Sequence, residues 1–189
     1  MRSGTDLDSA LEAARRGDQH GFAVLHRELV ASVTRFAHAR RVEDPEALTN
    51  EVFVAVFGGL DRFVGTSDDF RGWLFTIARN KVIDDSRRRR RRPRPSGVEP
   101  DPGMPAAVGT EAQVFARLGS EWVDDTLADL TEDQREVLQL RIVADLTVSE
   151  TARVLDKPVG AVKALQRRAL AALRRGISSD PYPFFDDRR

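Results

Sequence analysis

The chain has 189 residues, 41% of them hydrophobic, and its 30 basic and 30 acidic side chains give a formal net charge of +0. This is a globular composition with room for one or two small domains, and the lack of cysteine excludes disulfides and thiolate metal sites within the chain. No apolar run approaches the roughly 20 residues of a membrane span, and the N-terminus lacks the apolar stretch of a signal peptide, so we expect a cytoplasmic protein.

Apolar residues at helical spacing predict two helices in the first part of the chain. The first covers residues 7–16 and stops at Gly17, a residue typical of a helix C-terminus, and the second continues to about residue 41.

A third helix is predicted between Asp44-Pro45, which opens it, and Gly58-Gly59, which ends it. Two apolar rows run along this helix, and Phe57 belongs to the second row. The outward residues are polar or acidic: Glu46, Asn50 and Glu51. Such an edge can dock on a basic partner; the alternative is a plain core helix with a solvated edge.

The stretch from residue 70 to residue 92 is predicted to form a longer amphipathic helix. One side of this helix is an apolar stripe suited to burial. The side opposite the stripe carries Arg71, Phe75 and Arg79 along one line, with Asn80 and Arg87 close beside them. Guanidinium groups contact phosphate, an exposed aromatic ring stacks on an unpaired base, and an Asn side chain donates and accepts at base edges. This surface suits single-stranded DNA, and an ordinary amphipathic helix with solvated charges is the alternative.

An unbroken run of arginines, residues 87–92, follows on this helix. Residues 71–94 hold ten basic side chains against two acidic ones, a net of +8. This concentration of charge is typical of a protein that binds a polyanion, because each phosphate neutralised releases condensed counterions. A nuclear localisation signal is the competing interpretation.

Ser, Gly and Pro after residue 93 predict a flexible linker, and the sign of the charge reverses there. Residues 98–130 contain seven acidic side chains and one basic side chain. Two short helices are then predicted, over residues 121–130 and 132–143, and Thr131 with Gln134 forms a capping box at the start of the second one.

The pattern that follows predicts a helix-turn-helix. Thr147 and Glu150 form another capping box before a short helix, and residues 156–158 make a turn. A longer helix over residues 159–175 presents basic side chains, including Lys163, and no acidic residue occurs between residues 157 and 175. This acid-free helix favours DNA binding over the alternative of a protein-binding αα-hairpin.

Three segments in this order resemble the extracytoplasmic-function (ECF) sigma factors of bacterial RNA polymerase, which are small members of the sigma-70 family. Residues 44–53 (DPEALTNEVF) resemble the family's core-binding segment, residues 70–89 (FRGWLFTIARNKVIDDSRRR) its −10 segment, and residues 146–175 its −35 helix-turn-helix. The chain departs from the family at Ala47, Asn50 and Ala164-Leu165, which affects details of polymerase docking and the −35 bases read.

The resemblance implies an all-α fold of two small helical domains joined by a flexible linker. Residues 1–92 would be sigma region 2, residues 93–120 an acidic linker, residues 121–176 sigma region 4, and residues 177–189 a tail. The resemblance also implies three binding surfaces. For core polymerase they comprise Asp44, Glu46, Asn50, Glu51 and Phe57; for the −10 element Arg71, Phe75, Arg79, Asn80, Arg87 and Arg88; for the −35 element Lys163, Ala164, Arg167 and Arg168.

The implied partners are the β′ and β subunits of core RNA polymerase, promoter DNA and an anti-sigma factor, and no cofactor, metal or catalytic residue is expected. A one-component helix-turn-helix regulator that binds DNA without polymerase is the main alternative. A nuclease would need clustered carboxylates or histidines, but Asp84 and Asp85 point about 100 degrees apart on a helix and the three histidines share no metal-like spacing. A pure protein-interaction module is the last alternative.

Overall fold

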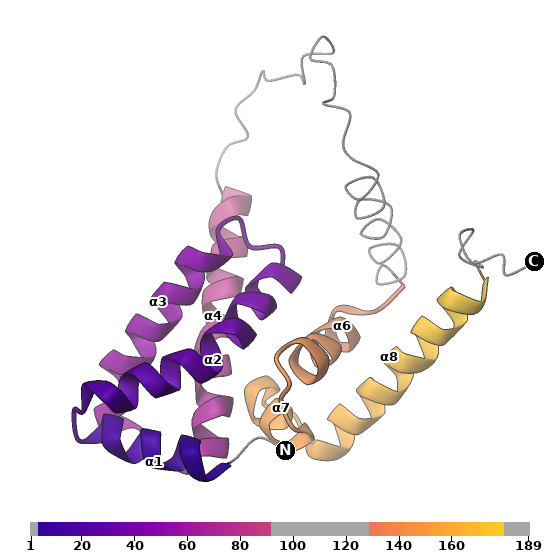
Figure 1. The fold of residues 1–189 in the computed structure, drawn as a ribbon. Helices are drawn as coiled ribbons and strands as arrows, with labels where there is room; N and C mark the ends of the chain where they lie inside the picture. Colours follow the sequence, from indigo (N-terminus) through magenta and orange to yellow (C-terminus); the bar gives the residue numbers. More distant parts are fainter. Residues whose placement is uncertain (1–3, 92–128, 180–189) are drawn as a thin grey trace, which may run out of the picture.

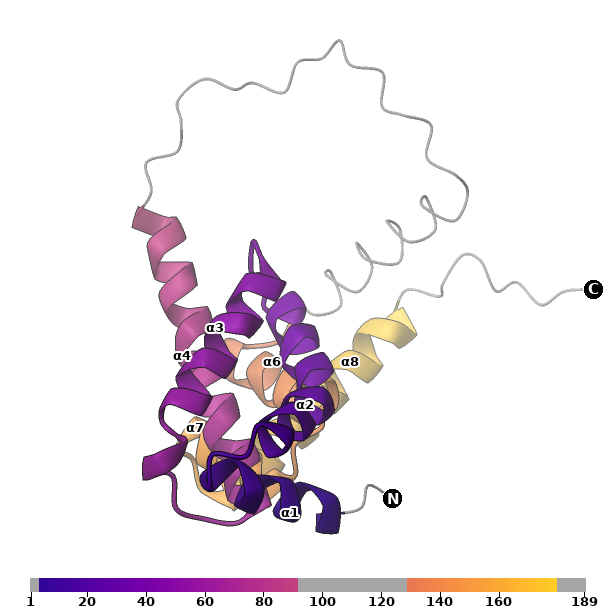
Figure 2. The same cartoon turned by 60° about the vertical axis from the view of Figure 1, so that its left-hand side comes forward.

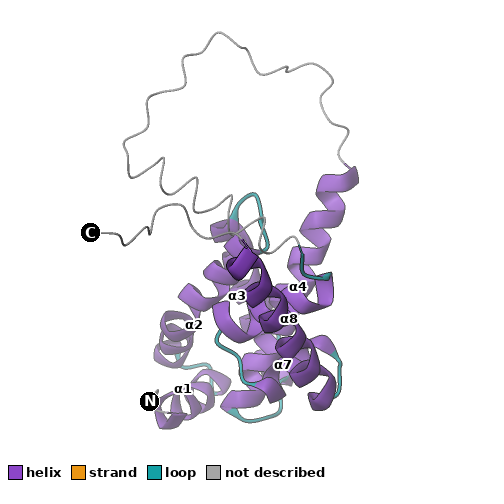
Figure 3. Cartoon of the chain, turned by 90° about the vertical axis from the view of Figure 1, so that its right-hand side faces the viewer, coloured by secondary structure: helices purple, strands orange, loops and turns teal. Residues whose placement is uncertain are grey.

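The computed structural model describes residues 4–91 and 129–179, and helix is the only regular secondary structure among them (Figure 3). The all-α prediction is therefore confirmed. The elements in chain order are α1 (Gly4–Arg15), α2 (Gln19–Ala39), α3 (Pro45–Gly58), the 3-10 turn η1 (Leu60–Arg62), α4 (Ser67–Arg91), α6 (Glu132–Leu138), the π-helical turn η2 (Gln139–Val143), α7 (Val148–Leu155) and α8 (Val159–Ser179). The linker predicted at residues 93–120 lies outside the described residues, as does most of the predicted tail.

Local sequence fixes where these helices begin. The Asp44 carboxylate accepts a hydrogen bond of 2.9 Å from a backbone N–H in the first turn of α3. Thr131 and Thr147 form the two predicted capping boxes, with Gln134 and Glu150 as the reciprocal partners. Each box satisfies two backbone donors that the helix itself leaves open, so the starts of α6 and α7 are set by their own residues.

The predicted helix over residues 132–143 is not one regular α-helix. It changes after α6 into the π-helical turn η2, in which the Ala144 N–H donates to the Gln139 carbonyl oxygen at 3.0 Å. The Arg141 side chain leaves this turn to bond the Leu146 carbonyl oxygen and the Gln166 side chain. The π turn thus ties the loop before α7 to α8.

The first unit consists of α1 to α4, and α4 contributes much of its buried core (Figure 1). Its fully buried side chains include Phe70, Leu74 and Phe75, and they pack with Phe36 of α2. The exposure predicted for Phe75 is wrong, because the ring is 0% exposed and meets Phe36 edge-on with centroids 5.8 Å apart. Phe75 precedes the buried Val82 by seven residues, or two helical turns, and so belongs to the apolar face.

The second unit, α6 to α8, packs against the first unit. In Figures 1 and 2, α7 lies beside the first half of α4, whereas α8 lies on the side of the second unit away from α4. One apolar cluster runs through both units and includes Phe75 and Val82 of α4 together with Val154 and Leu155 of α7. The two-unit organisation is confirmed, and the units share part of their core.

Candidate nucleic-acid and polymerase interfaces

The exposed side of α8 carries the residues predicted for the −35 element. Lys163, Arg167 and Arg168 are exposed, and Ala164 is half-buried beside them. Behind them Val162 and Ala169 are 0% exposed and fix the rotation of the helix. Because Lys163 and Arg167 are four residues apart, their side chains lie one turn apart on the same face. An exposed face of cationic hydrogen-bond donors is typical of a recognition helix that enters the major groove of DNA.

The residues predicted for the −10 element do not form one open surface. Asn80, Arg87 and Arg88 are exposed, but Phe75 is in the core. The Arg79 guanidinium donates to both carboxylate oxygens of Glu136 in α6, at 2.9 and 3.2 Å. Arg71 is likewise covered by the second unit, so the two inner arginines of the predicted DNA surface already hold protein partners.

The contacts of Arg71 are of two kinds. Its Nε lies 3.1 Å from Oε1 of Glu150 without the alignment of a hydrogen bond, so this contact is an ion pair. A terminal nitrogen donates to the Asp145 carbonyl oxygen at 2.7 Å. Glu150 is 2% exposed, which makes this a pair largely removed from water.

The arginine run at the end of α4 projects beyond the other helices in Figures 1 and 2. Two acids one turn earlier offset part of its charge, since Arg87 lies 3.7 Å from Asp84 and Arg89 lies 3.0 Å from Asp85. Arg89 is also held by the carbonyl oxygen of Arg41, at 2.7 Å. Arg88, Arg90 and Arg91 are exposed, so part of the charge at the end of α4 remains available to a polyanion.

The outward edge of α3 is exposed as predicted at Glu46, Asn50 and Glu51, and Asp44 caps the helix. Phe57 is half-buried against Phe22, with ring centroids 4.9 Å apart, so it contributes mainly to packing.

Val54 belongs to the same edge of α3 and is 74% exposed, yet the sequence analysis does not single it out. Its position one turn after Asn50 is the sequence signal that could have identified it. An exposed apolar residue among polar ones gives this edge the mixed character of a protein-binding surface.

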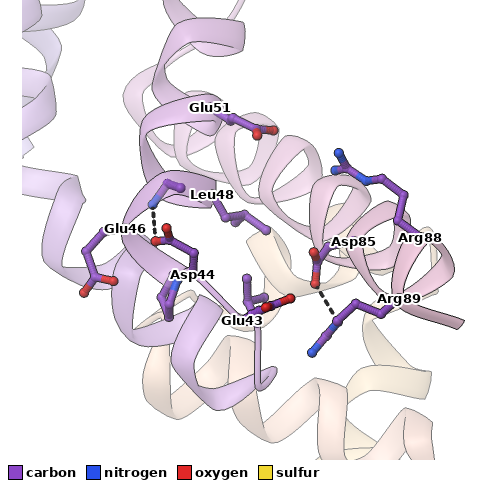
Figure 4. A pocket seen from close by; sticks show the side chains of 11 residues that line it. Glu43, Asp44, Glu46, Leu48, Glu51, Asp85, Arg88 and Arg89 are labelled. Carbon is purple, nitrogen blue, oxygen red and sulfur yellow. Dashed lines mark hydrogen bonds and ion pairs between the residues drawn. The ribbon is translucent and has the colours of Figure 1, made fainter. Parts of the chain in front are cut away.

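A groove of about 660 Å³ lies between the start of α3 and the end of α4 (Figure 4). The α3 side carries Glu43 and Glu46, and the α4 side carries Arg88 together with Arg89, which pairs with Asp85. At its border Glu51 accepts a hydrogen bond of 2.9 Å from Lys81, which holds the pKa of Glu51 below its usual value. The groove therefore carries side chains of both signs next to both predicted surfaces of the first unit.

Among the described residues, no helix is long and apolar enough to cross a membrane. Within the same residues, no group of three or more His, Asp or Glu side chains is placed to hold a metal ion.

Comparison with known proteins identifies both units. Residues 22–92 match Sigma-70 region 2, and residues 126–175 match Sigma-70, region 4. The chain is 39% identical over 132 residues to the ECF RNA polymerase sigma factor ShbA of Streptomyces griseus subsp. griseus, over 68% of this chain and 69% of ShbA. It is 32% identical over 186 residues to the ECF RNA polymerase sigma factor BldN of Streptomyces coelicolor, over 95% of this chain and 70% of BldN.

A solved structure agrees with these matches. CnrH, solved in complex with the cytosolic domain of CnrY, superposes with a TM-score of 0.69 at 28% identity, over 93% of this chain and 99% of CnrH. The matches to region 2 and region 4 follow the order of the two helical units and include the three segments on which the resemblance rests. The chain therefore belongs to the ECF sigma factors of the sigma-70 family.

Proposed function

We propose that this sigma factor divides promoter recognition among three surfaces. As a member of its family it binds core RNA polymerase and directs promoter recognition and transcription initiation. Residues 1–92 would act as region 2, and residues 121–176 as region 4. The chain would act by binding alone, in the cytoplasm where polymerase and promoter DNA are found.

The −35 element is assigned to α8. The support for this is the exposed basic face of Lys163, Arg167 and Arg168. The buried side chains on the other side of α8 orient this face toward solvent. Ala164 leaves space for a base edge between longer side chains. Arginine or lysine in the major groove prefers guanine O6 and N7, which these residues could reach from one face of the helix.

The −10 element is assigned to α4. Asn80, Arg87 and Arg88 are exposed and offer an amide for a base edge and guanidinium groups for phosphates. Arg71 and Arg79 join this surface only when their contacts with region 4 are released. Because Phe75 is buried, we propose no stacking role for it.

The outer edge of α3 is assigned to core polymerase, with Glu46, Asn50 and Glu51 as polar contacts and Val54 as an apolar one. Asp44 and Phe57 would support this edge by capping and packing.

A further protein partner, of the anti-sigma kind, is proposed as well. Its support is the similar protein CnrH, which was solved in complex with the cytosolic domain of CnrY.

The chain combines an exposed helix-turn-helix with a separate basic end of α4, and a one-component regulator would need only the first of these. Run-off transcription with core polymerase and genomic fragments tests the proposal. We expect discrete transcripts that depend on this chain. Specific duplex binding without polymerase, and no chain-dependent transcript, would instead support the one-component regulator.

A further inference from the structure

We propose that region 4 keeps region 2 closed to DNA through an ionic lock, in which Glu136 and Glu150 occupy the Arg79 and Arg71 guanidinium groups. The inference rests on the proposed function of α4, since those two arginines are assigned to the −10 strand. In the closed form, two carboxylates take the places that DNA phosphates would otherwise fill.

The pair of Glu136 and Arg79 is the stronger half of the lock. Both carboxylate oxygens accept from the guanidinium group, a bidentate geometry that phosphate shares. Glu136 is 4% exposed, and Arg40 of α2 approaches the same carboxylate at 3.8 Å. Since the Nε and one terminal nitrogen of Arg79 are directed at Glu136, a phosphate can bind there only after α6 moves away.

The pair of Glu150 and Arg71 links the lock to the helix-turn-helix. The Glu150 carboxylate completes the capping box of α7 and also faces the Arg71 guanidinium. A third ion pair, between Arg153 and Asp69, joins α7 to the first turn of α4. Three charged contacts therefore tie region 4 to one side of α4.

Apolar contacts reinforce this closure, because α7 packs on the α4 face that contains the buried Gly72. A Cβ atom at Gly72 would lie 4.0 Å from both the Glu150 carbonyl oxygen and an Arg153 side-chain nitrogen. This leaves room for one methyl group but not for a longer side chain.

The lock is selective for one of the two DNA surfaces. Lys163, Arg167 and Arg168 of α8 stay exposed in the closed form, whereas Arg71 and Arg79 do not. Closure should therefore weaken binding to single-stranded DNA and leave the duplex-binding surface of α8 unchanged.

Two variants open the lock by different routes. The double variant Glu136→Gln and Glu150→Gln removes both charges but keeps the side-chain length and a residue that suits a capping box. Gly72→Leu changes no charge and inserts a wedge between α4 and α7. Asp133→Asn is the matched control, because Asp133 pairs with Lys157 inside region 4, at 3.1 Å.

The separation of the units can be measured with spin labels, since the chain has no cysteine of its own. Cysteines replacing the exposed Ala31 and Gly160 would carry the labels, one on each unit. We expect one narrow, short distance in the wild-type chain and the control, and longer, broad distances in both opened variants. Wild-type chain bound to core polymerase should also show the longer distance.

DNA binding is measured on the same proteins with a random-sequence single-stranded oligonucleotide and a random-sequence duplex. The opened variants should bind the single strand about tenfold more tightly, because two more arginines reach phosphate, and should gain less on the duplex, whose binding surface on α8 is already exposed in the closed form. The proposal is overturned by a distance that is the same in all variants, by opening without tighter single-strand binding, or by an active holoenzyme that keeps the short distance. Failure of the wild-type holoenzyme to transcribe would count against the proposed function instead.

Discussion

Phe75 shows how one residue decides between two interpretations of α4. On sequence spacing it lies in line with Arg71 and Arg79, and an aromatic ring between arginines is typical of a nucleic-acid surface. In the structure the ring fills the space between α4 and α2. The burial of Phe75 follows from its spacing of seven residues, or two helical turns, from the apolar Val82, and not from its alignment with the two arginines.

Phe75→Ala is therefore expected to destabilise the protein. Removing a fully buried Phe side chain typically costs about 3–5 kcal/mol of the free energy of unfolding. Urea denaturation measures the loss. Val64→Ala serves as the control because Val64 is 91% exposed, and equal stability of the two variants would contradict the buried position of Phe75.

Arg167 is expected to affect DNA binding without affecting the fold. Arg167→Ala should weaken binding of holoenzyme to a −35 duplex by about 1–3 kcal/mol if the side chain reads a base. Titrations at several salt concentrations separate this from a phosphate contact, whose loss flattens the salt dependence by about one unit of slope. Arg27→Ala, on the exposed side of α2, is the control, and an equal effect of both variants would argue against α8 as the reader.

Glu51 should make a small contribution to stability that depends on pH. The hydrogen bond from Lys81 lowers its pKa in the folded state below the ordinary value of 4.5, so its contribution is present above that pH and is lost as the pH falls further. Because the side chain is 52% exposed, Glu51→Gln should cost less than about 1 kcal/mol at neutral pH. Denaturation at neutral and at acid pH measures it, and a larger cost at acid pH would refute this assignment.

At the scale of elements, the sequence predicts the helices well where short-range chemistry decides. The capping boxes at Thr131 and Thr147, the start of α3 at Asp44 and the end of α1 before Gly17 are all found as predicted. The π turn η2 is not predicted, because its extra residue per turn hardly changes the apolar spacing over one turn. Arg141 within this turn bonds Gln166 of α8, a contact between distant residues that no local pattern contains.

The edge of α3 can be tested with a residue that has no ion pair to disturb. Glu51 is unsuitable because it binds Lys81, whereas Val54 is exposed. Val54→Arg should weaken co-purification with core polymerase while the helix content measured by circular dichroism stays unchanged. Ala31→Arg, on α2, is the matched control; undiminished binding by the Val54 variant would move the polymerase contact to another surface.

At the scale of the whole molecule, the sequence predicts two helical units and a DNA-binding surface on each, but not how the units meet. Glu136 and Glu150 read as ordinary helix residues, one of them in a capping box. Their half-buried partners Arg79 and Arg71 lie in the other unit, across the linker. Such pairs depend on tertiary contacts between distant residues, which neither helical periodicity nor capping patterns contain.

The packing of the two units gives a different reason for weak promoter binding by the free chain than the sequence does. From the sequence, the linker would leave the two DNA readers without a fixed separation. In the structure they are held together with α4 partly covered. Docking of both units on polymerase would open the pair and set the separation that the −35 and −10 elements require.

Gel-shift titrations of one promoter fragment at a fixed salt concentration test this account most directly. The isolated chain and its complex with core polymerase are compared on the same DNA. We expect the holoenzyme to bind about a hundredfold more tightly or better, because the polymerase holds both readers at once. Equal affinities would contradict the account and show that the chain recognises promoters on its own.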